Sequence, residues 1–211
     1  VEMDFVNIGG AGNAADSTGH GAVGYNYEIG KYEVTISQFT TAYALDPRVG
    51  DGDEDNWSGV GQDAPATFVS WHEAAKFCNF LTTSNAYSGA YSINEDTGLV
   101  NGLDRDAGIA LGGGIAYVLP TEDEWCKAAY YTGSGYTLYA NGSGTAPAAG
   151  TEANYANAVG SPWIVGSGSM AEQNDTYDMM GNVWEWTETA FDGVLDSYED
   201  LAGHGGGYKS P

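Results

Sequence analysis

Hydrophobic and polar positions follow a regular period in only a few short stretches of this chain. Residues 25–29 alternate with a period of two, which predicts a half-buried strand. Residues 5–8 are also predicted to form a strand, and residues 31–34 continue extended. A further strand is predicted at 117–119, where the proline at position 120 ends it.

Three helices are predicted, and each begins with the same signature. A Thr or Ser is followed three residues later by Gln or Glu, so that each side chain binds a backbone N–H of the first turn. This capping box occurs at Thr35–Gln38, Ser70–Glu73 and Thr121–Glu124. The helices are predicted over residues 36–44, 71–83 and 122–131.

Long polar stretches separate these elements, over residues 46–62, 84–114 and 132–168. Such loops count against a regular helix bundle or β-sandwich. The chain has 211 residues, enough to bury a core, and shows neither an internal repeat nor a Pro/Ser-rich linker. We therefore predict a single domain over 1–211.

The net charge of the chain limits the classes of molecule that it is expected to bind. Lys and Arg number 6 against 29 Asp and Glu, which gives a formal net charge of −23. Such a surface repels phosphate backbones and anionic lipids, so nucleic-acid binding is not expected. No apolar run approaches the ~20 residues that span a bilayer, so membrane insertion is not expected either. The charge suits cations such as calcium, or a salty extracellular medium.

The two cysteines, Cys78 and Cys126, form no CxxC motif and have no histidine at a zinc-type spacing. Two interpretations stay open from the sequence: a single disulfide, or two buried thiols.

Motifs spread along the chain resemble the formylglycine-generating, sulfatase-modifying-factor family. The most specific is Gly-Asn-Val-Trp-Glu-Trp at 181–186. Five further segments match in order: 30–35 (Gly-Lys-Tyr-Glu-Val-Thr), 65–71 (Pro-Ala-Thr-Phe-Val-Ser-Trp), 119–125 (Leu-Pro-Thr-Glu-Asp-Glu-Trp), 153–155 (Ala-Asn-Tyr) and 204–208 (His-Gly-Gly-Gly-Tyr, with two departures). The resemblance implies an α+β, C-type-lectin-like fold in which short helices surround small antiparallel sheets and loops are long.

Asn182 and Glu185 are three residues apart in a glycine-punctuated turn and offer the hard oxygen ligands that calcium requires. From these residues alone, a turn cap at Asn182 and an ion pair at Glu185 would be favoured. The resemblance favours calcium instead, because the family signature holds a calcium ion. It implies ligation by the two side chains and by main-chain oxygens, here those of Met180 and Val183.

The family also has a second calcium site, which implies a role for the Asn154 side chain and the Tyr155 carbonyl. An acidic partner should lie downstream, yet residues 163–168 contain no carboxylate. An acidic run at 51–55 resembles the start of a calcium loop, but Asn56 and Gln62 break the EF-hand pattern, which favours a solvated loop.

The resemblance breaks at the catalytic thiols. Family oxidases need a thiol pair shortly after the Gly-Gly segment and convert a client cysteine to formylglycine, the aerobic ones with copper(I) held by those thiolates. Ser210 stands where the first thiol is expected. A hydroxyl neither ligates copper(I) nor acts as a redox thiol, so copper is not expected.

Three other side chains have sequence-based assignments. The period-two pair Trp184 and Trp186 is predicted to pack in the core, and His72, in a capping-box turn, is predicted to be a solvated surface histidine.

These features predict a non-catalytic, calcium-stabilised binding or structural module. Its Tyr-, Asn- and Gly-rich loops suit a carbohydrate or protein ligand, or packing between identical subunits in a surface layer or fibre. The alternative is a formylglycine-generating oxidase whose catalytic C-terminal segment is absent from this chain. Residues 12–25 are similar to an exported bacterial subfamily, which implies an extracellular or cell-surface location.

Overall fold

A computed structural model of the chain describes residues 1–50, 57 and 59–189. In chain order the elements are β1 (Phe5–Ile8), β2 (Tyr27–Gly30), α1 (Ile36–Leu45), the 3₁₀ turn η1 (Pro47–Val49), α2 (Trp71–Thr83), β3 (Tyr91–Ile93), β4 (Val100–Leu103), α3 (Arg105–Leu111) and α4 (Glu122–Tyr130). Short helices and two small antiparallel sheets confirm the α+β prediction.

The three predicted helices are confirmed to within one residue. All three capping boxes are formed in both directions, from the Thr or Ser side chain to the third helical N–H and back from the Gln or Glu side chain. These boxes fix the residues at which α1, α2 and α4 begin. Each box also supplies acceptors for backbone N–H groups at the helix start, which would otherwise need water as their partner. None of the helices in the described ranges combines the length and apolar character needed to cross a bilayer.

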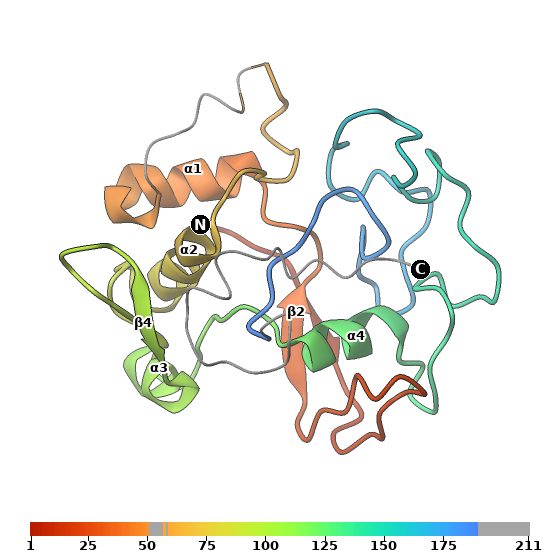
Figure 1. The fold of residues 1–211 in the computed structure, drawn as a ribbon, viewed down its shortest axis with the longest axis horizontal. Coiled ribbons are helices and arrows are strands. Elements are labelled where there is room, and N and C mark those ends of the chain that lie inside the picture. The colour runs from red at the N-terminus through yellow and green to blue at the C-terminus, as the bar shows by residue number, and fades with distance from the viewer. Residues whose placement is uncertain (51–56, 58, 190–211) are drawn as a thin grey trace.

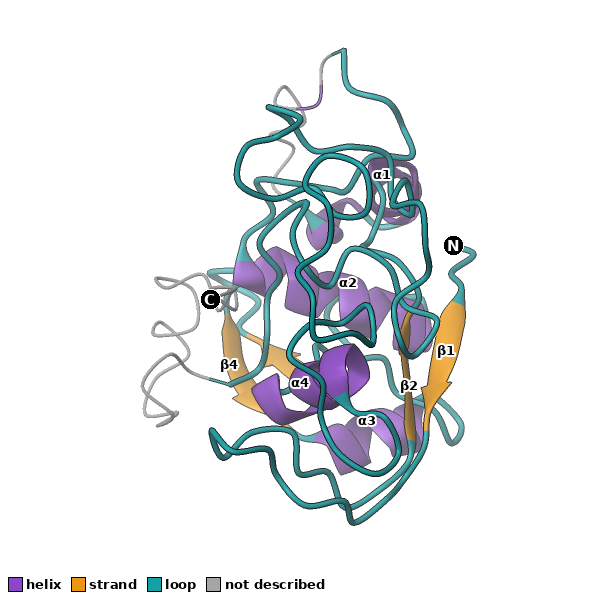
Figure 2. Cartoon of the chain, turned by 90° about the vertical axis from the view of Figure 1, so that its right-hand side faces the viewer, coloured by secondary structure: helices purple, strands orange, loops and turns teal. Residues whose placement is uncertain are grey.

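The strand β1 pairs with β2 in antiparallel register, from Phe5 opposite Gly30 to Ile8 opposite Tyr27. The two strands lie side by side in Figure 2. The start of β2 is two residues later than predicted. The predicted extended continuation over 31–34 is wrong, because residues 31 and 32 form a bend and the segment belongs to neither sheet; the Val34 carbonyl instead accepts a hydrogen bond from the Ala66 N–H, 2.8 Å away.

The prediction of a loop over 84–114 is wrong, because this segment contains β3, β4 and α3. A side chain of α2 holds β3 in place. Asn79 is fully buried, donates to the carbonyl of Tyr91 (2.7 Å) and accepts from its N–H (3.0 Å). A strand fixed by a distant helix side chain leaves no periodic signal in its own sequence.

The predicted strand at 117–119 is also not formed. Its backbone donors go to side chains rather than to another strand: the Tyr117 N–H bonds the Thr82 hydroxyl (2.9 Å) and the Leu119 N–H bonds the Tyr91 hydroxyl (2.8 Å). The segment is therefore held by side chains of α2 and β3 rather than by strand pairing.

The core consists of buried clusters on both faces of α2 and beneath α4. Phe77 and Phe80 face α1, whereas Trp71, Ala75 and Cys78 face β3 and β4. A separate cluster joins Trp125 of α4 to Ile8, Met179 and Met180. Figure 1 shows the result: α1, α2, β4 and α3 lie on one side, β2 and α4 lie centrally, and the loops after α4 form the other side.

The prediction for His72 is wrong. The side chain is buried in the first turn of α2, and its Nδ1 accepts a hydrogen bond from the Val100 N–H of β4 (3.1 Å). The histidine therefore joins α2 to the β3–β4 sheet.

Candidate metal centre and adjoining cavity

The signature segment 178–188 has a tight backbone that only certain residues tolerate. Gly181 has φ +146, and a Cβ at this position would overlap the Asn154 carbonyl oxygen. Asn182 follows with φ +60, in the left-handed region that Asn tolerates better than most residues. Glycine is therefore required for the close approach of segments 153–155 and 181–183.

Asn182 joins three parts of the chain. Its backbone N–H donates to the Asn154 carbonyl (2.8 Å), and its Oδ1 accepts from the Trp163 N–H (2.9 Å) and from Asn154 Nδ2 (3.1 Å). Its Nδ2 donates to Glu33 Oε2 (2.9 Å). The structure thus brings together Asn154 and Asn182, one from each of the two predicted calcium sites, and adds Glu33.

Around this turn lies a group of carboxylates, the buried Glu33, Glu172 and Asp178 and the partly buried Glu185, hereafter the carboxylate cluster. Burial, together with the charge of Asp178, raises the pKa of Glu185 to about 7, although a 2.6 Å hydrogen bond from Trp125 Nε1 acts in the opposite direction. Burial likewise raises the pKa of Glu172 to about 8, with Asp178 and Glu185 contributing. The negative charges of Asp178 and Glu185 thus raise the pKa values of neighbouring carboxyl groups in a region of low solvation.

Glu33 is the member of the cluster that has an unpaired carboxylate oxygen. Burial, and then the charges of Glu185 and Asp178, raise its pKa well above the ordinary value. Its Oε1 is buried and has no hydrogen-bond partner among the described residues. Within the same ranges, no ion pair joins any of the four carboxylates to a Lys or Arg. A buried, unpaired carboxylate oxygen is costly unless it is protonated or meets a cation.

These observations fit a hard cation. The donor set is oxygen-rich, negatively charged and includes one oxygen with no partner, as a calcium site requires. No three His, Cys, Asp or Glu side chains in the described part of the chain converge as a ready-made metal group. A calcium ion would therefore be held by at most two of these carboxylates, together with amide and main-chain oxygens.

The individual ligands stay predictions. Glu185 and Val183 lie at the cluster, and the Val183 N–H bonds Glu33. The Met180 side chain is buried, with its sulfur 3.1 Å from the Ala140 nitrogen. Asn154 Nδ2 also donates to the Ser161 carbonyl (2.9 Å), and the Tyr155 carbonyl accepts from the Ala158 N–H (3.1 Å).

Sequence reasoning missed Glu33, Glu172 and Asp178. Glu33 stands in the matched segment 30–35 and Asp178 stands four residues before Asn182, but no local spacing relates either of them to Glu185. The available signal was weaker: acidic residues within otherwise apolar motifs, in a chain with few basic partners.

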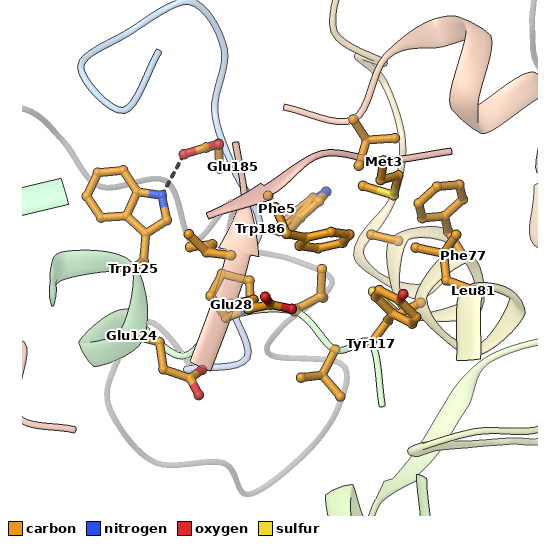
Figure 3. A pocket seen from close by; sticks show the side chains of 18 of the residues that line it. Met3, Phe5, Glu28, Phe77, Leu81, Tyr117, Glu124, Trp125, Glu185 and Trp186 are labelled. Carbon is orange, nitrogen blue, oxygen red and sulfur yellow. Dashed lines mark hydrogen bonds between the residues drawn. The ribbon is translucent and has the colours of Figure 1, made fainter. Parts of the chain in front are cut away.

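A cavity of about 640 Å³ adjoins the cluster. Its walls are mostly apolar, with Met3, Phe77 and Leu81 at one end, while Trp125, Glu124 and Glu185 lie at the other (Figure 3). Trp186 lines it and donates through Nε1 to the Val69 carbonyl (2.8 Å).

The prediction that Trp184 and Trp186 share a buried face is half wrong. Trp186 is partly buried, but Trp184 is 65% exposed at the cavity wall. The segment forms bends and irregular backbone rather than a strand, so its side chains need not alternate between two faces.

The two cysteines are both free and buried, so the interpretation as two buried thiols is confirmed. Burial raises the pKa of Cys78 to about 12 and that of Cys126 to about 12. The acidic run at 51–55, the segment 204–208 and Ser210 lie outside the described residues.

Comparisons with known proteins place this geometry in a family. Residues 9–210 match the sulfatase-modifying factor enzyme 1-like domain. A protein of Paenibacillus barcinonensis named chaperone protein LppX is 28% identical over 188 residues, which is 76% of this chain and 61% of that relative. The chain thus spans about three-fifths of that relative's length.

A solved structure titled "Crystal Structure of CarF" shares the fold, with a TM-score of 0.58 and 23% identity over 90% of this chain and 82% of that one. The family match includes the carboxylate cluster and every segment on which the sequence resemblance rests, and it includes the cavity wall apart from Met3 and Phe5. The chain belongs to the sulfatase-modifying factor enzyme 1-like domain family.

Proposed function

We propose that this chain is a non-catalytic binding or structural module of an exported protein, stabilised by calcium at the carboxylate cluster. The unpaired Glu33 Oε1, buried beside Glu185 and Asp178, is the observation that carries the calcium part. A divalent cation there would relieve the repulsion that raises the pKa values of the cluster.

The state of the thiols supports a non-catalytic role. The thiolate is the reactive form of cysteine, and a pKa of about 12 leaves Cys78 and Cys126 protonated at neutral pH. Ser210 supplies no thiol at the position that the family resemblance marks. Copper(I), which needs soft thiolate ligands, is therefore not part of the proposal.

Binding is the function that the remaining features suit. The chain pairs a preformed cavity with long polar loops, and one relative carries the name of a chaperone, which fits a module that holds other polypeptides without altering them. The acidic surface and the resemblance of residues 12–25 to an exported subfamily support an extracellular or cell-surface location. Packing of identical subunits into a layer or fibre is a further form of the same proposal.

Calcium-dependent stability tests the proposal. Chelator-treated protein is unfolded thermally with added calcium, magnesium or neither. Calcium at about 100 times its Kd stabilises by ~2.7 kcal/mol, which for a domain of this size raises the Tm by roughly 5–10 °C. Magnesium, which demands tighter octahedral geometry, is expected to give a much smaller shift.

A matched pair of variants tests whether calcium stabilises the protein through the carboxylate cluster. Glu33 and Glu73 are each 9% exposed, but Glu73 closes the capping box of α2, a role that Gln also fills. Glu33→Gln is expected to lose most of the calcium shift, and Glu73→Gln to keep it. A calcium shift that is absent from the wild type, or equal in both variants, would contradict the proposal.

Family membership supports the alternative function, an oxidase whose catalytic segment lies outside this chain. Incubation of the natural full-length protein, purified from its source, with a cysteine-containing client peptide, followed by mass spectrometry, distinguishes the two functions. The binding module leaves the peptide cysteine unchanged, whereas the oxidase converts it to formylglycine.

A further inference from the structure

Asparagine is followed by glycine at two places in the chain, Asn101–Gly102 and Asn141–Gly142. In such a pair the peptide nitrogen readily attacks the preceding side-chain amide, because glycine has no Cβ to hinder the approach. Asn101 lies in β4 with an exposed side chain, whereas Asn141 lies in the loops after α4 (Figure 1). The two sites share one dipeptide, so any difference between their reactivities in the folded protein comes from the structure.

The backbone around Asn141 forms an Asx turn. Asn141 Oδ1 accepts a hydrogen bond from the Ser143 N–H (3.1 Å), which folds the side-chain carbonyl over the intervening peptide of Gly142. The Ser143 hydroxyl lies 3.0 Å from the same oxygen and 2.9 Å from the Thr145 carbonyl, and its single hydrogen points to one or the other. The turn thus directs the amide carbon of Asn141 toward the nitrogen that attacks it.

The Ser143 donors also favour the reaction itself. Attack on Asn141 Cγ puts negative charge on Oδ1, and N–H and O–H groups aimed at such an oxygen stabilise that charge. The competing bonds are long: the Gly142 N–H donates to the Tyr139 carbonyl at 3.2 Å, and Asn141 Nδ2 donates to the Thr145 carbonyl at 3.3 Å. Gly142 is exposed, so water reaches the site.

The other pair lacks this arrangement. Among the described residues, none forms a hydrogen bond with the Asn101 side chain, so no donor polarises its amide oxygen. Its backbone belongs to β4, which pairs with β3. Asn101 is therefore an internal reference for the reactivity of the dipeptide without the turn.

The residue before Asn141 holds the loop against the signature segment. Ala140 is fully buried, its N–H donates to Met180 Sδ (3.1 Å), and its carbonyl accepts from the Gln173 N–H (2.7 Å). Isoaspartate continues the chain through its side-chain carboxyl and so lengthens the backbone by one carbon at position 141. This change next to Ala140 disturbs both bonds.

We propose that Asn141 is a site of spontaneous modification, favoured by the Ser143 donors, which converts to aspartate and isoaspartate and thereby loosens the loop from the signature segment. The Gly142 nitrogen loses its proton to solvent base and forms a bond to Asn141 Cγ, while the bond from Cγ to Nδ2 breaks and ammonia leaves with a proton from water. Water then opens the cyclic imide at either carbonyl carbon. The net reaction consumes one water, releases one ammonia and needs neither oxidant nor cofactor. The proposal is independent of the calcium site.

A time course at pH 8 tests the proposal, because the attacking nitrogen must lose a proton. Peptides from each time point are analysed by mass spectrometry, with electron-transfer fragmentation to separate aspartate from isoaspartate. We expect Asn141 to convert about tenfold faster than Asn101 in the folded protein, because the turn and the Ser143 donors favour it. In denaturant, where the dipeptide alone decides, we expect the two rates to be equal.

Two variants at the site provide controls. Ser143→Ala removes the hydroxyl but keeps the N–H donor, so conversion of Asn141 is expected to slow about fivefold, the effect of one hydrogen bond, while conversion of Asn101 stays unchanged. Asn141→Gln blocks the reaction, because its longer side chain has to close a larger ring. Thermal unfolding of the aged wild type is expected to show a second transition at lower Tm, which grows with the isoaspartate fraction and is absent from aged Asn141→Gln.

Three results would overturn the proposal. The first is a conversion rate at Asn141 in the folded protein that is no higher than the rate at Asn101. The second is an Asn141 rate that Ser143→Ala leaves unchanged, which would remove the role of the donors. The third is an unchanged unfolding profile in a sample whose Asn141 has become isoaspartate, which would show that the loop stays attached.

Discussion

Arg105 is the residue whose removal should disturb the fold most specifically. Its guanidinium lies 2.8 Å from Glu124 Oε1 and 2.7 Å from Glu188 Oε2, and it also donates to the Leu119 carbonyl (3.1 Å). Tyr25 and Tyr91 donate to the same two carboxylates, at 2.6 Å and 2.5 Å. The ion group joins α3 to α4 and to the end of the signature segment.

Replacement of Arg105 by Met keeps much of the side-chain volume but leaves two buried carboxylates without their cation. Removing one partner of a buried ion pair costs about 3–5 kcal/mol, and Arg105 is itself 26% exposed, which favours the lower end. For a domain of this size, about 3 kcal/mol lowers the Tm by roughly 6–12 °C. Arg48→Met is the control, because the Arg48 side chain is 51% exposed and its buried partner Asp46 keeps hydrogen bonds from the Arg48 and Ala86 N–H groups, so that a smaller loss of ~1 kcal/mol is expected.

The pH dependence separates lost charge pairing from lost packing. Burial alone would raise the pKa of Glu124, but Arg105 outweighs it and holds the pKa below the ordinary value. The wild type therefore gains stability above pH ~4.3 and loses it as the pH falls further. In Arg105→Met the buried carboxylates have raised pKa values, so their penalty is largest at neutral pH and fades on acidification.

Thermal unfolding by circular dichroism at pH 7 and pH 5 measures both effects. We expect the Tm difference between wild type and Arg105→Met to shrink at pH 5. A variant as stable as Arg48→Met at pH 7, or a Tm difference that does not change with pH, would refute the reasoning.

Three further predictions concern the candidate site. Burial raises the pKa of Glu172 to about 8 and that of Glu185 to about 7, so the chelator-treated folded state binds more protons than the unfolded state between pH 5 and 8. The free energy of unfolding should therefore fall as the pH rises over this range, and Glu172→Gln should make that decrease smaller. A free energy of unfolding that rises with pH would contradict the prediction. Gly181→Ala should lower the free energy of unfolding by about 1–3 kcal/mol and abolish the calcium-induced rise in Tm. Gly12 also has a positive φ, but a Cβ there would meet no atom within 4 Å, so Gly12→Ala should destabilise less and keep the calcium effect. Calorimetry measures both variants. Cys78 and Cys126 should resist a thiol reagent in the native protein and both react after denaturation; rapid native labelling would refute their burial.

The sequence predicted those elements whose signals are local. Each capping box is formed by two side chains three residues apart, and the boxes at Thr35, Ser70 and Thr121 placed three helices correctly. The hairpin β3–β4 was missed because Asn79, at least twelve residues away in the chain, supplies the hydrogen bonds that position it. Long-range bonds of this kind override local pattern.

The candidate site was predictable in part for the same reason. Asn182 and Glu185 stand in one motif and could be found from it. Glu33 lies 149 residues away from its partner Asn182, and only the fold brings its carboxylate against theirs. The exposure of Trp184 and the burial of His72 were mispredicted because both assignments relied on local position alone, whereas contacts from distant segments decide burial.

Calorimetric titration of calcium into the chelator-treated protein tests the central claim most directly. The account predicts saturable binding in the wild type and in Glu73→Gln, with protons released near pH 7 as the cation displaces them from the carboxylate cluster, detected as heat that varies with the ionisation enthalpy of the buffer. It predicts that Glu33→Gln weakens this binding. Absence of calcium binding, or binding that Glu33→Gln leaves unchanged, would contradict the account.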